Sequence, residues 1–157
     1  MECVYVFDTA IGRIAIGEKD GAITLLRLPG EEAPEEMDQR ETELLGRAAA
    51  QLREYLAGER REFDLPLAPE GTAFQKAVWN ALLEIPYGET CSYGQIAARV
   101  GNPKACRAVG MANHRNPIPI FIPCHRVVGA DGSLTGYGGG LECKQTLLQL
   151  EKTHGGR

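Results

Sequence analysis

The sequence has little of what membrane, disulfide-linked and metal-binding proteins need. No apolar run approaches the roughly 20 residues that span a bilayer, and the first residues lack the basic and apolar regions of a signal peptide. The five cysteines are odd in number, scattered and without a CxxC pair. The three histidines do not fall at zinc-ligand spacing. We therefore expect a cytoplasmic protein with free thiols and with no metal, cofactor or membrane association.

Net positive charge, a common property of nucleic-acid-binding proteins, is also missing, because the 157-residue chain carries −4. The total hides an asymmetry. Residues 1–70 hold eight Lys and Arg against sixteen Asp and Glu, a net of −8, whereas residues 71–157 hold nine against five, a net of +4. This split suggests an acidic, solvated first part and a second part able to face phosphates, although charge alone leaves a chance imbalance equally open.

The pattern of the first part predicts a small α/β unit. β-branched and aromatic residues favour three strands, at residues 4–7, 13–16 and 22–26. Asp20-Gly21 is a strong hairpin signal. The acidic stretch 29–38 predicts a loop, and apolar residues at helical spacing predict a helix over 44–56 with Gly58 at its C-terminal cap. We expect this part to support the rest of the protein.

Residues 65–71 have the composition of a linker, and the charge balance changes there. We therefore place a boundary between domains of residues 1–68 and 69–157. Thr72 opens a capping-box pattern that predicts a helix at the start of the second domain, and another helix is expected from Leu141.

Between them, two short helices are expected over residues 93–100 and from 104 to about 113, joined by a tight turn at Gly101. This is a helix-turn-helix pattern. The second helix has mostly small side chains, which let a backbone approach the minor groove, and Arg107 suits a probe that enters the base stack. A packed core helix with Arg107 in a salt bridge explains the local sequence equally well.

A candidate nucleophile lies in residues 122–127, where Cys124 follows a proline and precedes His125 and Arg126. A thiolate is a strong soft nucleophile, and neighbouring cationic or imidazole groups lower the pKa of a thiol. A buried structural cysteine is the alternative, which these residues alone do not exclude. The glycine-rich stretch 136–140 has neither Walker nor dinucleotide-binding spacing.

Together these residues resemble the O6-alkylguanine-DNA alkyltransferases, repair proteins that take an alkyl group from guanine onto a cysteine. Six motifs carry the resemblance, in residues 92–95, 101–105, 107–110, 116–117, 123–127 and 136–137. It implies an α+β protein with a small N-terminal ribonuclease-H-like α/β domain. A mainly helical, winged helix-turn-helix-like C-terminal domain follows in the stand-alone form of the family.

The resemblance implies single-turnover DNA repair, in which the alkyl group of a flipped-out O6-alkylguanine moves irreversibly to Cys124. His125 would deprotonate Cys124 through a bound water, and Glu151 would hold and polarise His125. Asn116 would tie the helix-turn-helix to the cysteine loop, and Tyr93 would protonate the leaving guanine. The implied partner is double-stranded DNA, bound through its minor groove by a monomer.

Arg107 would fill the gap left by the flipped-out nucleotide. The resemblance implies further substrate-binding or DNA-binding residues, namely Ser92, Ala105, Val127, Tyr137 and Gly138. Asn113 occupies a position where vertebrate members have a methionine, so the size of the accepted alkyl group stays open.

Three other functions are alternatives to this one. A non-catalytic alkyltransferase-like protein also binds lesions, but such proteins replace the cysteine, so the presence of Cys124 speaks against it. A helix-turn-helix regulator with an incidental cysteine predicts major-groove binding to one defined sequence. A cysteine hydrolase lacks a recognisable oxyanion arrangement and a separate catalytic histidine.

Overall fold

The computed structural model describes residues 2–134 and 140–155. The chain forms two compact units, Met1–Glu70 and Gly71–Arg157. Each has its own buried apolar residues and is described by itself. Within the described part of the chain, no helix combines the length and the apolar character needed to cross a membrane.

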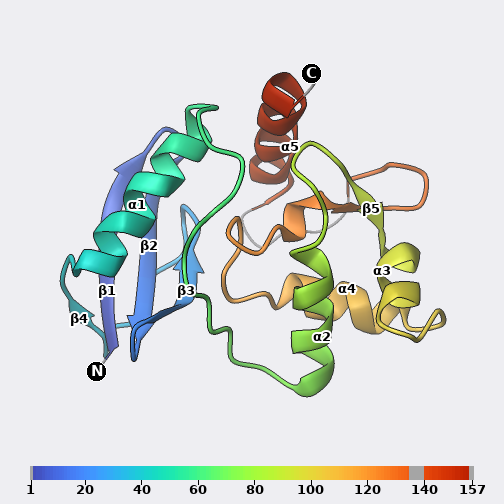
Figure 1. Cartoon of the computed structure of the whole chain (residues 1–157), viewed down its shortest axis with the longest axis horizontal. Helices are drawn as coiled ribbons and strands as arrows, with labels where there is room; N and C mark the ends of the chain where they lie inside the picture. Colours follow the sequence, from blue (N-terminus) through green and yellow to red (C-terminus); the bar gives the residue numbers. More distant parts are fainter. Residues whose placement is uncertain (1, 135–139, 156–157) are drawn as a thin grey trace. The chain divides into compact units, whose positions relative to one another are not determined.

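The first unit is a four-stranded sheet with one helix across a face (Figure 1). Its elements are β1 (Glu2–Thr9), β2 (Gly12–Lys19), β3 (Ala22–Arg27), β4 (Asp38–Gln39) and α1 (Glu43–Leu56). The strand order is β3-β2-β1-β4, in which β2 is antiparallel to both β1 and β3, and β4 is parallel to β1. The three predicted strands and the helix are confirmed, and each strand is longer than predicted. Gly58 follows the α1 cap with a φ of +80°.

Both faces of this sheet are covered. Alternate residues of β1 point to opposite faces, so one strand contributes to both. Phe7 faces α1, where the Arg53 guanidinium lies 5.1 Å from the centre of its ring. Val4 lies on the other face, packed with Ala15 and with Met37 of the acidic stretch. The acidic stretch is a loop until β4, which the sequence pattern did not predict. Its two residues come directly after the buried Met37 and pair with Cys3 and Val4 of β1.

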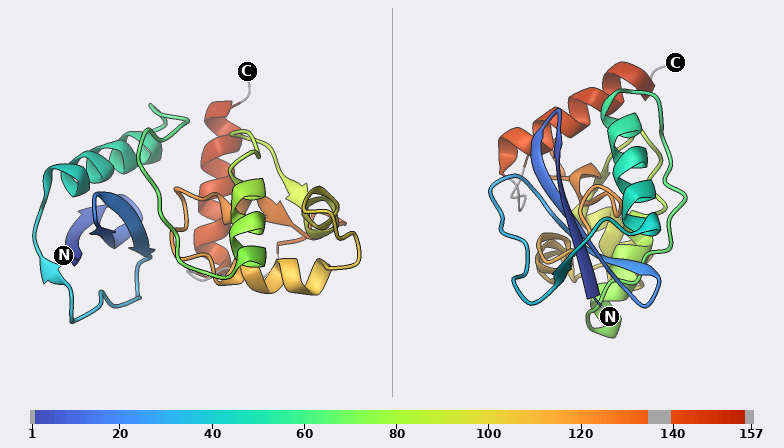
Figure 2. Two further views of the ribbon diagram at one scale, coloured as in Figure 1. Left: turned by 60° about the horizontal axis from the view of Figure 1, so that its bottom comes forward. Right: turned by 90° about the vertical axis from the view of Figure 1, so that its left-hand side faces the viewer.

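The second unit is mainly helical. Its elements are α2 (Ala73–Leu82), β5 (Cys91–Ser92), α3 (Tyr93–Arg99), α4 (Cys106–His114), the 3-10 turn η1 (Cys124–Arg126), β6 (Val127–Val128) and α5 (Leu141–Gly155). The predicted cap at Thr72 is confirmed, and Ser92 also caps a helix, each with a complete capping box. α2 packs against α4 and α5 packs against η1 (Figure 2). β5 and β6 form a short parallel pair.

The helix-turn-helix is also confirmed, with a correction to its second helix. α3 ends before Gly101, whose φ is +85°. α4 begins at Cys106 rather than at Lys104 as predicted. The reason is a turn in which the Ala105 N–H donates to the Asn102 carbonyl, and this turn delays the helical ladder by two residues.

A tryptophan fixes the end of α4. Trp79 of α2 is 1% exposed, and its indole Nε1–H donates to the Ala112 carbonyl at 2.9 Å. Ala112 is among the last four residues of α4, whose carbonyls have no partner within the helix. The bond therefore satisfies a group that helix geometry leaves open, and it anchors α4 to α2.

Replacing Trp79 by Phe should lower the free energy of unfolding by about 1–3 kcal/mol, because a buried carbonyl loses its donor and the core loses volume. Urea unfolding followed by far-UV circular dichroism measures this, since the chain has no other tryptophan to report by fluorescence. Thr146→Ala, which removes an exposed bond to the Glu142 carbonyl, is the control. A loss for Trp79→Phe no larger than for Thr146→Ala would contradict the anchoring role.

Candidate active site

Cys124, the predicted nucleophile, is the first residue of η1 and is 4% exposed. The segment before it is tightly turned. Ile120 has a φ of +74°, a left-handed conformation that β-branched residues rarely adopt, and the Cys124 N–H donates to the Ile122 carbonyl at 2.7 Å. Strained backbone of this kind persists only where the surroundings enforce it, and it clusters at functional sites. The cysteine is therefore held in a fixed, enclosed position.

Two asparagines connect α4 to the cysteine segment. Asn116 donates from Nδ2 to the Ile122 carbonyl at 2.9 Å and accepts the Ile118 N–H through Oδ1 at 2.9 Å. Asn113, in the last turn of α4, is buried and donates from Nδ2 to the Cys124 carbonyl at 3.3 Å. A shift of α4 is therefore transmitted to the backbone of the candidate nucleophile.

Next to the cysteine, His125 is paired with the carboxylate of Glu151 from α5. Nε2 of His125 lies 2.7 Å from Oε2 of Glu151, and both side chains are buried. Burial lowers the pKa of His125, although the hydrogen bond to Glu151 opposes the shift. A neutral imidazole that donates Nε2–H to a carboxylate carries its acceptor lone pair on Nδ1. Burial therefore favours the neutral imidazole, whose Nδ1 can accept a proton.

Arg126 binds the same carboxylate. It donates from Nε to Oε1 of Glu151 at 2.8 Å and from Nη2 to Oε2 at 2.9 Å, the bidentate geometry that suits a guanidinium. Its Nη1 donates to the Ile85 carbonyl at 2.7 Å, and the guanidinium lies 5.7 Å from the centre of the Tyr87 ring. The Gly88 N–H adds a bond to Oε1 of Glu151 at 3.1 Å. Burial alone would raise the pKa of Glu151, but His125 and Arg126 outweigh it and hold the pKa at about 2.

A buried lysine lies on the same side of α5. Lys144 is 0% exposed and donates from Nζ to the Val127 carbonyl at 2.6 Å. Burial lowers its pKa, and the charge of Cys124 acts in the opposite direction. Lys144, Leu147 and Glu151 are the buried residues of α5, spaced by three and four positions along one helical face. The second unit therefore gathers a thiol, an imidazole, a carboxylate and two cationic side chains.

The other predicted residues lie on the helix-turn-helix. Tyr93 begins α3, and its ring lies beside Gly110 of α4, where a Cβ would make an ordinary van der Waals contact with the ring at 3.8 Å. Ser92 uses its hydroxyl to cap α3, and Ala105 directly precedes α4. Arg107 is exposed and forms no ion pair with the described residues, so it is not the salt-bridged core residue considered above.

Two predicted pocket residues, Tyr137 and Gly138, lie outside the described residues. Val127 is described and fully buried in β6, with its carbonyl directed to Lys144. Within residues 2–134 and 140–155, no group of three or more His, Cys, Asp and Glu side chains could hold a metal ion.

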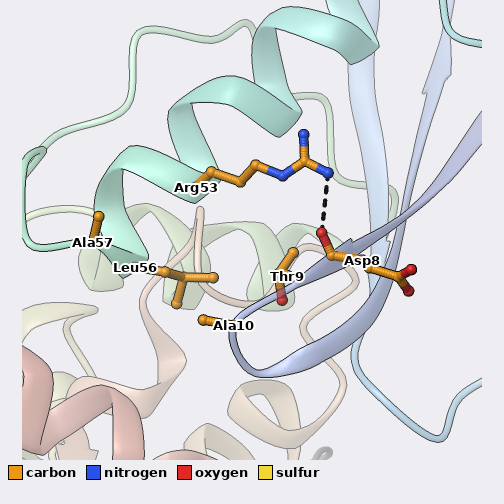
Figure 3. Close-up of a pocket in the computed structure, with 6 residues that line it drawn as sticks. All are labelled: Asp8, Thr9, Ala10, Arg53, Leu56 and Ala57. Carbon is orange, nitrogen blue, oxygen red and sulfur yellow. Dashed lines mark hydrogen bonds between the residues drawn. The ribbon is translucent and has the colours of Figure 1, made fainter.

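A separate pocket lies in the first unit (Figure 3). Its volume is about 350 Å³, and its lining residues are Asp8, Thr9, Ala10, Arg53, Leu56 and Ala57. The Arg53 guanidinium donates from Nη2 to the Asp8 carbonyl at 3.0 Å and also stacks on Phe7. Arg53 therefore joins the last turn of α1 to the end of β1. The lining of the pocket contains no thiol or imidazole.

Two family models match the chain. The ribonuclease-like domain of 6-O-methylguanine DNA methyltransferase matches residues 4–69, and the DNA binding domain of the same family matches residues 73–153. The chain belongs to the 6-O-methylguanine DNA methyltransferase family. The two matches also confirm the predicted architecture of this methyltransferase, a ribonuclease-like α/β domain followed by a mainly helical DNA-binding domain.

Full-length relatives agree. The methylated-DNA–protein-cysteine methyltransferase of Methanosarcina acetivorans is 53% identical over 150 residues, which are 93% of this chain and 96% of the relative. The constitutive protein of that name from Bacillus subtilis is 50% identical over 152 residues, 92% of each chain. The crystal structure of Mycobacterium tuberculosis OGT in complex with DNA has a TM-score of 0.91 at 47% identity, covering 97% of this chain and 94% of that one. Both units of the methyltransferase are therefore shared with these relatives.

Sequence reasoning did not find three groups around the cysteine of this methyltransferase. Arg126 was noted only as a basic neighbour of the thiol, whereas the structure turns it onto Glu151. Lys144 has a signal in the sequence, because it precedes Leu147 and Glu151 at helical spacing. Asn113 was noted only for the size of the accepted alkyl group, because its bond to the cysteine loop depends on where α4 ends.

The network around Glu151 makes stability depend on pH. The pKa of Glu151 is lowered from 4.5 to about 2, so the unfolded chain binds this proton first as the pH falls. The stabilisation is complete above about pH 4.5, and most of it is lost by about pH 2, a change of about 3 kcal/mol. Urea unfolding across this range should show a steep fall for the wild type and a flatter one for Glu151→Gln.

Glu142→Gln, which removes an exposed carboxylate at the start of the same helix, is the control and should keep the slope of the wild type. Equal slopes for Glu151→Gln and the wild type would show that the carboxylate is not held in its charged form by its partners.

Proposed function

We propose that this chain repairs DNA by direct reversal, with Cys124 accepting the alkyl group of an O6-alkylguanine once per molecule. The observation that carries the proposal is the succession of Cys124, His125 and Glu151, a buried thiol beside an imidazole held by a carboxylate. The reaction class follows from the family, whose relatives at 50% identity or more are named methylated-DNA–protein-cysteine methyltransferases.

In the proposed reaction, Sγ of Cys124 attacks the alkyl carbon, so that an S–C bond forms as the C–O6 bond breaks. The thiol proton passes through a bound water to His125, and the electron pair of the broken bond leaves with the guanine. Tyr93 donates a proton to the departing base and so stabilises the charge that gathers on it. The thioether on Cys124 has no good leaving group, which makes each molecule a single-use acceptor.

The charges of the described site support these roles. Glu151 remains ionised far below neutral pH, so it can stabilise the imidazolium that forms on His125. The Cys124 and Val127 carbonyls accept bonds from Asn113 and Lys144 but retain a second lone pair each. We propose that these carbonyls bind the exocyclic amine of guanine. The predicted roles of Tyr137 and Gly138 in the same pocket remain predictions.

We propose that α4 is the element that enters the DNA minor groove. Its small residues let the backbone approach the sugar edges, and exposed Arg107 fills the space of the extruded nucleotide. Ser92 and Ala105 lie beside α3 and α4 at the same helix-turn-helix. A relative with this fold, the Mycobacterium tuberculosis protein, has been crystallised in complex with DNA. The protein is proposed to act as a cytoplasmic monomer.

Incubation with duplex DNA that contains O6-methylguanine should add one methylene unit to the peptide that carries Cys124, because the methyl group replaces the thiol hydrogen. Intact-protein and peptide mass spectrometry measures this. Cys124→Ser should bind the DNA and gain no mass, whereas Cys3→Ala, which removes a cysteine of the first unit, should react as the wild type does. Unchanged wild-type mass on competent DNA would refute the function and leave a helix-turn-helix regulator as the stronger reading.

Arg107→Ala should slow methyl transfer from duplex DNA by about tenfold or more, because the extruded nucleotide is no longer replaced in the stack. Transfer from free O6-benzylguanine, which needs no extrusion, should change much less. Single-turnover rates on both substrates measure the contrast. Arg13→Ala, an exposed arginine of the first unit, is the control. Equal losses on both substrates would contradict the role of Arg107 in base extrusion.

A further inference from the structure

We propose that Arg126 is a positioning residue that keeps His125 neutral and ready to accept the thiol proton, by sharing the Glu151 carboxylate with it. The inference rests on the proposed function and assigns to that reaction a residue outside the succession of Cys124, His125 and Glu151.

The geometry divides one carboxylate between two partners. Oε2 of Glu151 accepts from His125 at 2.7 Å and from Nη2 of Arg126 at 2.9 Å, while Oε1 accepts from Nε of Arg126 at 2.8 Å. Arg126 is itself fixed by the Ile85 carbonyl at 2.7 Å and by the Tyr87 ring. With 6% of its surface exposed, it is not a mobile surface charge. Its position beside Glu151 is therefore built into the fold.

The charged groups that act on His125 come from two elements. α5 contributes the negative Glu151 and the basic Lys144, and η1 contributes Arg126. Glu151 favours the imidazolium, whereas Arg126 and Lys144 disfavour it. Burial is the largest of the effects that disfavour the imidazolium, and Arg126, which contacts the carboxylate directly and carries a permanent charge, is the larger of the two charged groups that add to it.

A base with this task needs a counterweight to the carboxylate. A carboxylate alone within hydrogen-bond distance raises the pKa of a histidine by one or more units, which would leave the imidazole protonated and unable to accept the thiol proton. Burial opposes the charged form of His125 with or without Arg126. The arginine adds a positive charge that offsets the carboxylate, and its two hydrogen bonds to Oε1 and Oε2 hold both carboxylate oxygens in place.

The positive charge of Arg126 and its bidentate hydrogen bonding to Glu151 can be separated by substitution. Arg126→Met removes both, whereas Arg126→Lys keeps a positive charge but cannot form the bidentate pair. Single-turnover methyl transfer from an O6-methylguanine duplex would be measured for both variants and the wild type between about pH 5 and about pH 9, the range in which histidine titrates. Each rate–pH profile is normalised to its own plateau. Arg99→Met, which removes an arginine from an exposed ion pair with Glu84, is the matched control.

Protonation of His125 removes the base, so the rate falls on the acid side of the profile. Arg126→Met should move this acid limb upward by about one pH unit, which is about tenfold in rate at a fixed pH on the limb. Arg126→Lys should keep the wild-type limb and lose plateau rate, because the charge remains while the orientation is weakened. Arg99→Met should keep both. A merely structural role would lower plateaus without moving a limb.

A normalised Arg126→Met profile that superimposes on the wild-type profile would overturn the inference. If Arg126→Met does not fold, a nitrogen-15 NMR titration of wild-type His125 decides, since the imidazole must be neutral, with its proton on Nε2, at pH 7. An imidazolium at that pH overturns the inference. The two proposals fail separately: a wild type that transfers no methyl group refutes the function, whereas transfer with an unmoved limb refutes only the role of Arg126.

Discussion

The buried carboxylate of Glu151 is the group on which the second unit depends. It joins α5 to η1, 25 residues earlier in the chain, and to the Gly88 turn, 63 residues earlier. A buried charge is expensive unless its lone pairs are used, and here His125, Arg126 and Gly88 use them. Removing one partner would leave charge without compensation. The network therefore stabilises one position of α5, the position in which Glu151 reaches all three partners.

The same unit couples recognition to chemistry. α4 is anchored at its end by Trp79 and is tied to the cysteine segment by Asn113 and Asn116. The helix proposed to bind DNA and the thiol proposed to react with it thus share one set of hydrogen bonds. Because such bonds are costly to break, the distance between α4 and Cys124 is maintained by the core rather than by a flexible loop.

The two units divide the charge of the protein unequally. The first unit is acidic, and both faces of its sheet are covered. Met37 of the acidic loop packs on one face, and α1 packs on the other. The second unit carries the positive balance and the chemical groups. Its cationic residues serve two purposes, because Arg107 is exposed at the helix-turn-helix whereas Arg126 and Lys144 are buried around the reactive cysteine.

Local patterns in the sequence were enough for the strands of the first unit, the capped helix that follows Thr72 and the helix-turn-helix, and they marked Cys124 as a candidate nucleophile. These features depend on residues a few positions apart, which a sequence displays directly. The family resemblance added Glu151 as the partner of His125. Only the tertiary structure decided that Arg126 shares that carboxylate, that Lys144 is buried on Val127, and that Asn113 reaches the Cys124 carbonyl. Such contacts join residues far apart in the chain, and they exist only once α4, α5 and η1 are packed together.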